Sequence, residues 1–322
     1  VLMLAGDHHN VCVVGDTDQC FPAGTTISTP DGHRPIESIS IGDRILGANQ
    51  HSPTIASSVV HVHEGRYDGR LVRVDVAGRS VGATPGHLVP MRLVPQPGSW
   101  LVYLMYRADR GWRIGRTVGA RPFPKGVRKH GLFVRSSQEH ADAAWVLRVC
   151  NSLAEAAYHE AWFAAEYGIP TACFHDAGRG LAMDEEWLRR LFNAIDTGDR
   201  AKRLLADLEL SVEFPHHRPQ NGARRATVNL TMFSDTRGTV GYHRVQWSPN
   251  RDDVADKLRA AGYTLRSGKS KSLRYETVYK SYETALADAR RFAAAADIDV
   301  RRRLGHGGVV YDLMPIANAR PG

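Results

Sequence analysis

The chain changes character at the bond between Gln19 and Cys20. Upstream, residues 10–16 (NVCVVGD) form a short apolar run closed by Gly-Asp, which predicts a buried parallel strand that ends in a loop. Downstream, the β-prone segment 25–29 leads into residues 30–32 (Pro-Asp-Gly), where proline sets φ and glycine accepts a positive φ. We therefore expect a strand that ends just before Cys20 and an antiparallel hairpin that begins just after it.

Two sequence blocks follow this bond. The first opens with residues 20–25 (CFPAGT) and closes with residues 41–46 (IGDRIL). The second is residues 82–87 (GATPGH), which has the pattern Thr-x-x-His at Thr84 and His87. Together they resemble the splicing blocks of inteins and of the wider Hint fold, and the resemblance extends from Cys20 to about residue 90. It implies an all-β Hint domain, represented here by its N-terminal part.

The resemblance also implies a chemistry for these residues. The thiol of Cys20 would attack the carbonyl carbon of Gln19 and convert the Gln19–Cys20 amide into a thioester, an N-to-S acyl shift. The thiolate is the nucleophilic form of cysteine. The developing oxyanion needs hydrogen-bond donors, and the departing nitrogen needs a proton. His87 titrates in a suitable range to supply that proton, and Thr84 would hold the scissile bond. No cofactor is needed for this reaction.

The segment before Cys20 suggests a host protein. Residues 11–19 (VCVVGDTDQ) resemble the ATPase motif of UvrD/Rep-type DNA helicases, in which the glutamine, here Gln19, senses the nucleotide phosphate. Inteins favour insertion into such nucleotide-binding motifs. The resemblance implies an ATP-dependent DNA helicase as host, with ATP bound by the host and not by the intein.

The composition of the chain restricts its expected cellular location and number of domains. The chain has 322 residues, a formal net charge of +8 and four cysteines. The cysteines form no C-x-x-C pair and no disulfide framework, which favours a reducing, cytoplasmic location. No stretch approaches the ~18 apolar residues of a membrane span, so no membrane partner is expected. The length allows two or three domains.

Basic residues are concentrated between positions 107 and 135, where Asp109 is the only acid. Such clusters suggest contacts with the phosphates of DNA. Residues 101–106 and 111–117 predict a two-stranded hairpin, which together with a helix at 152–167 loosely resembles the GIY-YIG nuclease core. The resemblance implies nuclease roles for Tyr103, for Arg128 as the helix arginine, and for Glu160 as the ligand of a divalent metal such as Mg²⁺. Arg113 stands where the second motif has tyrosine, and the identity of any metal is unknown.

A second basic region follows. Residues 202–210, 252–261 and 282–296 predict helices, and residues 226–233, 240–247, 264–265 and 274–280 predict strands. This α-β-β-α-β-β-α order resembles half of a LAGLIDADG homing endonuclease without its acidic signature helix. The expected DNA contacts across both basic regions are Arg113, Arg116, Arg244, Lys269, Lys271 and Arg274.

These observations predict five segments. They are a helicase-derived segment (1–19), the Hint region (20–100), a basic α/β insert resembling GIY-YIG nucleases (101–180), an α+β DNA-binding region resembling LAGLIDADG nucleases (181–306) and a return to the splicing domain (307–322). Residues 309–313 (VVYDL) are similar to the penultimate intein block, but no terminal His-Asn follows. We therefore expect the chain to need a missing C-terminal intein segment as a partner to complete splicing.

Three alternatives stay open. The chain could be a DNA-binding or nuclease protein with an inert Hint-like start. An ordinary helicase fragment is disfavoured because the chain contains no G-x-x-x-x-G-K-[ST] motif. A Hedgehog-type autoprocessing domain is disfavoured by the helicase-like segment before Cys20.

Overall fold

The computed structural model describes residues 20–47, 55–76, 78–176, 182–219, 227–235, 242–248, 252–267 and 273–320. These residues form a mixed arrangement of helices and strands, as predicted. The chain divides into two compact units. Unit 1 comprises Val1–Arg92 and Ala226–Ala319, and unit 2 comprises Leu93–Arg225 and Arg320–Gly322. The helicase-like segment, Gln19, Lys269 and Lys271 lie outside the described residues.

Unit 1 begins with three antiparallel two-stranded sheets, whose strands are β1 (Thr26–Thr29) and β2 (Gly32–Pro35), β3 (Arg44–Gly47) and β4 (Ile55–Ser58), and β5 (Val72–Val76) and β6 (Arg79–Ala83). The first pair confirms the predicted hairpin. Thr29 pairs with Gly32 across the turn, and Gly32 has a φ of 127°, which a residue with a Cβ rarely adopts. Ile39, Ile45 and Val59 form a small core beside these strands.

The larger part of unit 1 is a seven-stranded sheet with the order β15-β16-β14-β13-β17-β18-β7. Its strands are β7 (Leu88–Met91), β13 (Thr227–Asp235), β14 (Tyr242–Trp247), β15 (Arg266–Ser267), β16 (Leu273–Tyr279), β17 (Asp299–His306) and β18 (Val309–Pro315). β13 and β17 pair in parallel, and the other pairs are antiparallel. The sheet therefore joins β7, from the Hint-like region, to strands more than 130 residues later.

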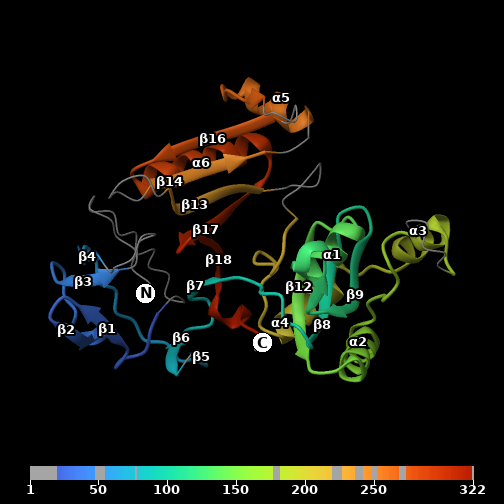
Figure 1. Cartoon of the computed structure of the whole chain (residues 1–322), viewed down its shortest axis with the longest axis horizontal. Coiled ribbons are helices and arrows are strands. Elements are labelled where there is room, and N and C mark those ends of the chain that lie inside the picture. Colours follow the sequence, from blue (N-terminus) through green and yellow to red (C-terminus); the bar gives the residue numbers. More distant parts are fainter. Residues whose placement is uncertain are drawn as a thin grey trace. The chain divides into compact units, whose positions relative to one another are not determined.

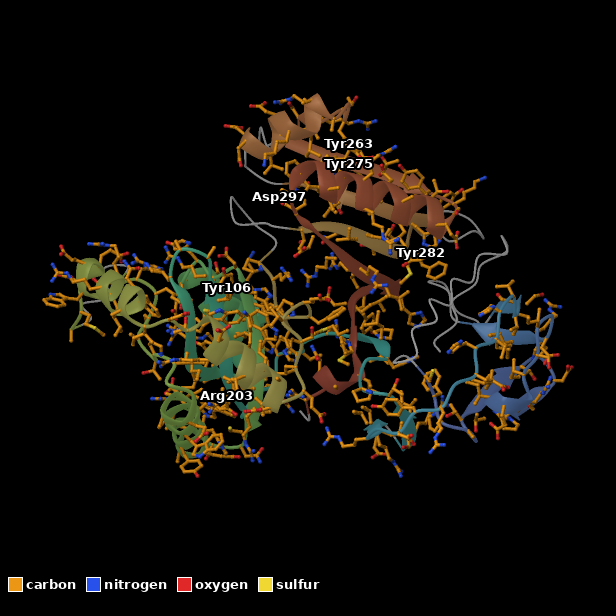
Figure 2. The ribbon with its side chains drawn as sticks, turned by 180° about the vertical axis from the view of Figure 1, so that it is seen from behind. Tyr106, Arg203, Tyr263, Tyr275, Tyr282 and Asp297 are labelled. Atoms are coloured by element: carbon orange, nitrogen blue, oxygen red, sulfur yellow. The ribbon has the colours of Figure 1, made fainter. Side chains whose placement is uncertain are left out.

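Two helices accompany this sheet, α5 (Asp252–Ala260) and α6 (Tyr282–Ala296). α6 lies along one face of β13, β14 and β16 (Figure 1) and buries Phe292 and four alanines against them. Figure 2 shows Tyr263 and Tyr275 beside this helix, and their rings contact edge to face at 5.2 Å. Ser281 begins α6 by accepting a hydrogen bond from the amide of Thr284.

Unit 2 is built on the antiparallel sheet β12-β8-β9, which consists of β8 (Trp100–Arg107), β9 (Gly111–Val118) and β12 (Ala143–Cys150). A short ribbon pairs β10 (Ala120–Pro122) with β11 (Arg128–His130). The helices are α1 (Gly131–Gln138), α2 (Leu153–Tyr167), α3 (Glu185–Ala194) and α4 (Gly198–Asp207).

Alternating residues of β8 belong to two different cores. Val102 and Leu104 pack with residues of α2 and α4, whereas Tyr103 packs with residues of α1 and α3. Because successive side chains of a strand point to opposite faces, the helices cover both faces of this sheet. β9 is an edge strand, and its Ile114 amide donates to the Pro170 carbonyl at 2.9 Å.

Most predicted elements are confirmed. The hairpin predicted at 101–106 and 111–117 is β8–β9, and the predicted helix at 152–167 is α2, with Ser152 as its N-cap. The predicted α-β-β-α-β-β-α order is also present, from α4 to α6. The predicted boundary at 100/101 falls inside β8, whereas the two units meet at residues 92 and 93. Among the described residues, no helix is long and apolar enough to cross a bilayer.

Candidate functional site

Cys20 and Thr84 are hydrogen-bonded partners in unit 1, although they are 64 positions apart. The Cys20 amide donates to Oγ1 of Thr84 at 2.9 Å, and the Thr84 amide donates to the Cys20 carbonyl at 2.9 Å. The Thr84 hydroxyl also lies 3.3 Å from that carbonyl as a donor. Thr84 thus holds the Cys20 peptide unit through both its side chain and its backbone.

His87 lies in the same loop, between β6 and β7. The His87 amide donates to the Thr84 carbonyl at 3.0 Å, which closes a turn with Pro85 and Gly86 at its centre. Both Thr84 and His87 are buried, at 1% and 4% exposure. The imidazole packs against Phe21, the residue after Cys20, with 4.2 Å between ring centroids. The structure therefore brings together all three residues predicted for the acyl shift.

The late segment of the chain holds this loop from the other side. β18 pairs with β7, and the 3-10 helix η4 (Ile316–Asn318) follows it directly. The Ile316 amide donates to the His87 carbonyl at 2.7 Å, and the Ala317 amide donates to the Pro85 carbonyl at 3.2 Å. No sequence motif marked Ile316 or Ala317, because these contacts use only backbone atoms between distant segments.

This geometry suits proton transfer at an amide nitrogen. The Cys20 nitrogen would become an amine if its bond to Gln19 broke, and the Thr84 hydroxyl already contacts that nitrogen. The imidazole of His87, a group able to donate or accept a proton, is buried one turn away. No disulfide joins Cys20, Cys150 and Cys173, so the Cys20 sulfur is not held in a covalent bridge among these residues.

Unit 2 contains the residues predicted for the nuclease. Tyr103 is buried on β8, and its hydroxyl accepts a hydrogen bond from Arg113 Nη1 at 3.2 Å. Glu160 lies on α2, where it forms an ion pair with Arg116 from β9. Two residues assigned separately, one as a metal ligand and one as a DNA contact, are therefore partners of each other.

The helix assignment of Arg128 is wrong. Arg128 lies in β11 and is exposed, because residues 128–130 pair with β10 to close a short ribbon and the helix begins only at Gly131. The helical arginine is Arg135, in α1. The basic residues between positions 107 and 135 gave no signal for this difference, since arginines occur on both sides of the ribbon.

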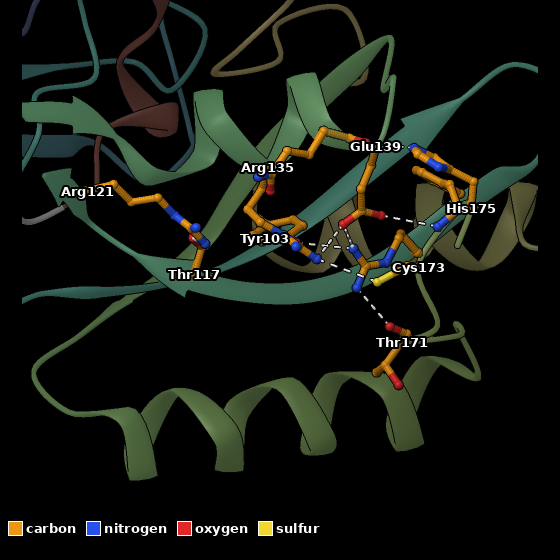
Figure 3. A network of polar contacts seen from close by, with 11 residues as sticks. Tyr103, Thr117, Arg121, Arg135, Glu139, Thr171, Cys173 and His175 are labelled. Carbon is orange, nitrogen blue, oxygen red and sulfur yellow. Dashed lines mark hydrogen bonds and ion pairs between the residues drawn. The ribbon is translucent and has the colours of Figure 1, made fainter. Parts of the chain in front are cut away.

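Arg135 belongs to a buried network that the sequence did not reveal. Glu139 is fully buried, and its Oε1 accepts from Arg113 Nη1 and from Arg135 Nη2, both at 2.6 Å. Its Oε2 accepts from the Phe174 amide at 3.2 Å. Figure 3 shows Arg135, Glu139 and Tyr103 converging. The available signal was the Arg135–Glu139 spacing of four residues, which places two opposite charges on one helix face.

The network keeps Arg113 charged. Burial lowers the pKa of Arg113, but the neighbouring Tyr103 hydroxyl and Glu139 carboxylate raise it by more, so the net shift is upward. Arg113 Nη2 also donates to the Thr171 carbonyl at 2.8 Å. Glu139 therefore acts as a counter-ion that two guanidinium groups share.

The remaining predicted DNA contacts lie in unit 1. Arg244 on β14 and Arg274 on β16 both pair with Glu276, and the Arg244 Nε to Glu276 Oε1 distance is 3.3 Å. Their combined charge exceeds that of the single carboxylate between them. A role for them in DNA binding stays a prediction.

Searches against protein-family models, curated proteins and solved structures found no match to this chain.

Proposed function

We propose that unit 1 carries out an N-to-S acyl shift at the Gln19–Cys20 bond, as the first step of intein-type protein splicing within a Hint domain. The observation that carries this proposal is the double attachment of Thr84 to the Cys20 peptide, through the 2.9 Å bond from Cys20 N and the 2.9 Å bond to Cys20 O. This attachment holds the nitrogen whose bond must break.

In the proposed step, the Cys20 sulfur forms a bond to the carbonyl carbon of Gln19, and the bond from that carbon to the Cys20 nitrogen breaks. The thiol loses one proton and the nitrogen gains one, so the step is balanced without a cofactor. His87 is the proton donor to the nitrogen, and Thr84 keeps that nitrogen in place. The amide resonance lost in the step is compensated by this positioning and by protonation of the leaving group.

The proposal extends to the host. Residues 11–19 would belong to an ATP-dependent DNA helicase in the cytoplasm, and splicing would restore its interrupted ATPase motif. Expression of the complete gene product would test this part, since a host band lacking the intein should appear with wild-type Cys20 and be absent with Cys20→Ala.

The acyl shift itself can be tested on this chain. A carrier protein fused before Val1 should be released by dithiothreitol or hydroxylamine, because both reagents cleave thioesters. We expect Cys20→Ala to abolish release, and Thr84→Val to slow it by ~10²-fold, as expected when a positioned hydrogen-bonding group is removed from a reacting centre.

Two matched controls accompany these variants. Thr26→Val makes the same substitution at an exposed position of β1, and Cys173→Ser removes a thiol of unit 2. Both should release the carrier at the wild-type rate. Release that persists in Cys20→Ala, or a Thr84→Val rate equal to that of Thr26→Val, would contradict the proposal.

A further inference from the structure

Unit 2 has a cavity of about 960 Å³ that borders the edge strand β9. Its lining comes from β8, β9, β10, α1, α2 and the segments beside them. Cavities of this size accept ligands as large as a nucleotide. The residues that give it its charge are four arginines and one glutamate, Arg113, Arg116, Arg121, Arg135 and Glu160.

Positive charge exceeds negative charge around this cavity. Arg116 is paired with Glu160, while Arg113 and Arg135 share Glu139. Arg121 donates only to a neutral group, the Thr117 hydroxyl, at 3.3 Å among the contacts described. Four guanidinium groups are therefore balanced by two carboxylates, which leaves an excess of two positive charges.

Several donors around the cavity are unused. In the part of the chain that the structure describes, the Nε atoms of Arg113, Arg121 and Arg135 are buried and have no hydrogen-bond acceptor. Arg113 itself is only 3% exposed. The pKa of Arg121 is lowered by burial and then by the nearby Arg135, as expected for like charges held together. Buried donors without acceptors are costly unless a ligand satisfies them.

We infer that this cavity binds a phosphodiester group of a nucleic-acid strand through Arg121 and its neighbouring guanidinium groups, without a divalent cation. Guanidinium groups present paired donors that match the oxygens of a phosphate. Trp100 and Phe123 also line the cavity and offer rings on which a base can stack. The inference concerns unit 2 and does not depend on the acyl shift in unit 1.

Binding is expected to need no divalent cation because Glu160 is already paired with Arg116. Glu160 is the one acidic side chain in the described lining, and Arg116 already neutralises it. A Mg²⁺ ion would have to displace this guanidinium to reach the carboxylate. Removing the negative charge of Glu160 should therefore favour the phosphate, because it frees Arg116 for the ligand and removes a repulsive group.

The test measures fluorescence anisotropy of the 322-residue chain with labelled 20-nucleotide strands in EDTA. Single-stranded DNA, duplex DNA and single-stranded RNA form separate arms, which distinguish the source of the phosphodiester. We expect binding in EDTA to at least one of them. Arg121→Gln should weaken it by ~10-fold, the effect of losing a charge-assisted hydrogen bond. The slope of the logarithm of the affinity against the logarithm of the salt concentration should also decrease by roughly the amount expected for one phosphate contact.

Arg128→Gln is the matched control, because it removes the same charge from the same ribbon outside the cavity lining. It should leave affinity within ~2-fold of wild type, the scale of a screened surface charge. Glu160→Gln should bind at least as tightly as wild type in EDTA. This second variant reports on the site even if Arg121→Gln fails to fold.

The inference is overturned if no strand binds in EDTA, if Arg128→Gln loses as much affinity as Arg121→Gln, or if Glu160→Gln abolishes binding. The last result would indicate that Glu160 holds a cation that bridges to the phosphate. Failure of carrier release from unit 1 would not affect any of these measurements.

Discussion

The buried carboxylate of Glu139 offers a sharp test of what stabilises unit 2. Glu139→Gln keeps the shape of the side chain but removes its charge. Arg113, which is 3% exposed, would then remain buried without its counter-ion, and Arg135 would lose its only described carboxylate partner. Removing one partner of a buried pair costs about 3–5 kcal/mol, because the remaining charge stays desolvated.

The contacts of Glu139 set the size of the expected loss in unfolding free energy. Three donors converge on Glu139, namely two guanidinium groups at 2.6 Å and the Phe174 amide at 3.2 Å. A glutamine oxygen can still accept from some of them, so we expect a loss near the lower end, about 3 kcal/mol. With a urea dependence of about 2 kcal/mol/M, the unfolding midpoint should fall by about 1.5 M.

Tryptophan fluorescence in urea is a suitable assay. Of the six tryptophans, Trp247 lies in unit 1 and the others lie in unit 2, so the signal reports mainly on unit 2. Glu166→Gln, which removes a half-exposed partner of Arg203, is the control and should change stability by less than about 0.5 kcal/mol. The triple change Arg113→Met, Arg135→Leu and Glu139→Leu removes all three charges of the network and should recover most of the loss. If the urea midpoint of Glu139→Gln equals that of Glu166→Gln within error, the Glu139 carboxylate does not stabilise unit 2 as a shared counter-ion.

Two further predictions concern unit 2. Burial lowers the pKa of His130 to about 4, below its unfolded value, so its neutral form is favoured in the fold and stability should fall as the pH decreases from about 6.5 to about 4. At ~1.4 kcal/mol per pKa unit, the loss of unfolding free energy should reach roughly 3 kcal/mol. Protonation also removes the Nδ1 acceptor of the Leu132 amide. Urea midpoints measured across this range should show a shallower fall in His130→Asn, and an unchanged slope would count against the assignment. Gly168 ends α2 with a φ of 64°, and a Cβ there would also displace the flexible end of Arg200, so Gly168→Ala should lower stability by about 1 kcal/mol in the same urea assay. Gly198→Ala, at a position without a positive φ, should be nearly neutral, and equal losses in the two variants would rule out backbone strain as the cause.

Local sequence signals located most elements well. The helix predicted at 282–296 is α6 with the same bounds, because a serine cap precedes a continuous run of helix-forming residues. The hairpin of β1 and β2 followed from the Pro-Asp-Gly turn. These features depend on neighbouring residues only, so their physical causes are visible in the sequence.

The predicted site residues of unit 1 were also brought together. Cys20, Thr84 and His87 were selected by motif. In the structure Cys20 is hydrogen-bonded to Thr84, and His87 is hydrogen-bonded to Thr84 and packs against Phe21, the residue after Cys20. The support from Ile316 and Ala317 was not predictable in the same way, because backbone amides of any residue type could make those bonds. The error at Arg128 has a similar origin, since a basic run does not reveal where a ribbon ends and a helix begins.

The local elements and the chemistry available at Cys20 followed from the amino-acid sequence, because turns, caps and reactive side chains act over a few residues. Which charged side chains become partners depended on the tertiary structure. In the tertiary structure β7 pairs with β18, which lies far along the chain. Glu139 forms ion pairs with both Arg113 and Arg135, and Glu160 forms one with Arg116. These partnerships depend on which strands are neighbours in a sheet and which helices cover it. Long-range packing sets that arrangement, and a sequence pattern read along the chain does not contain it.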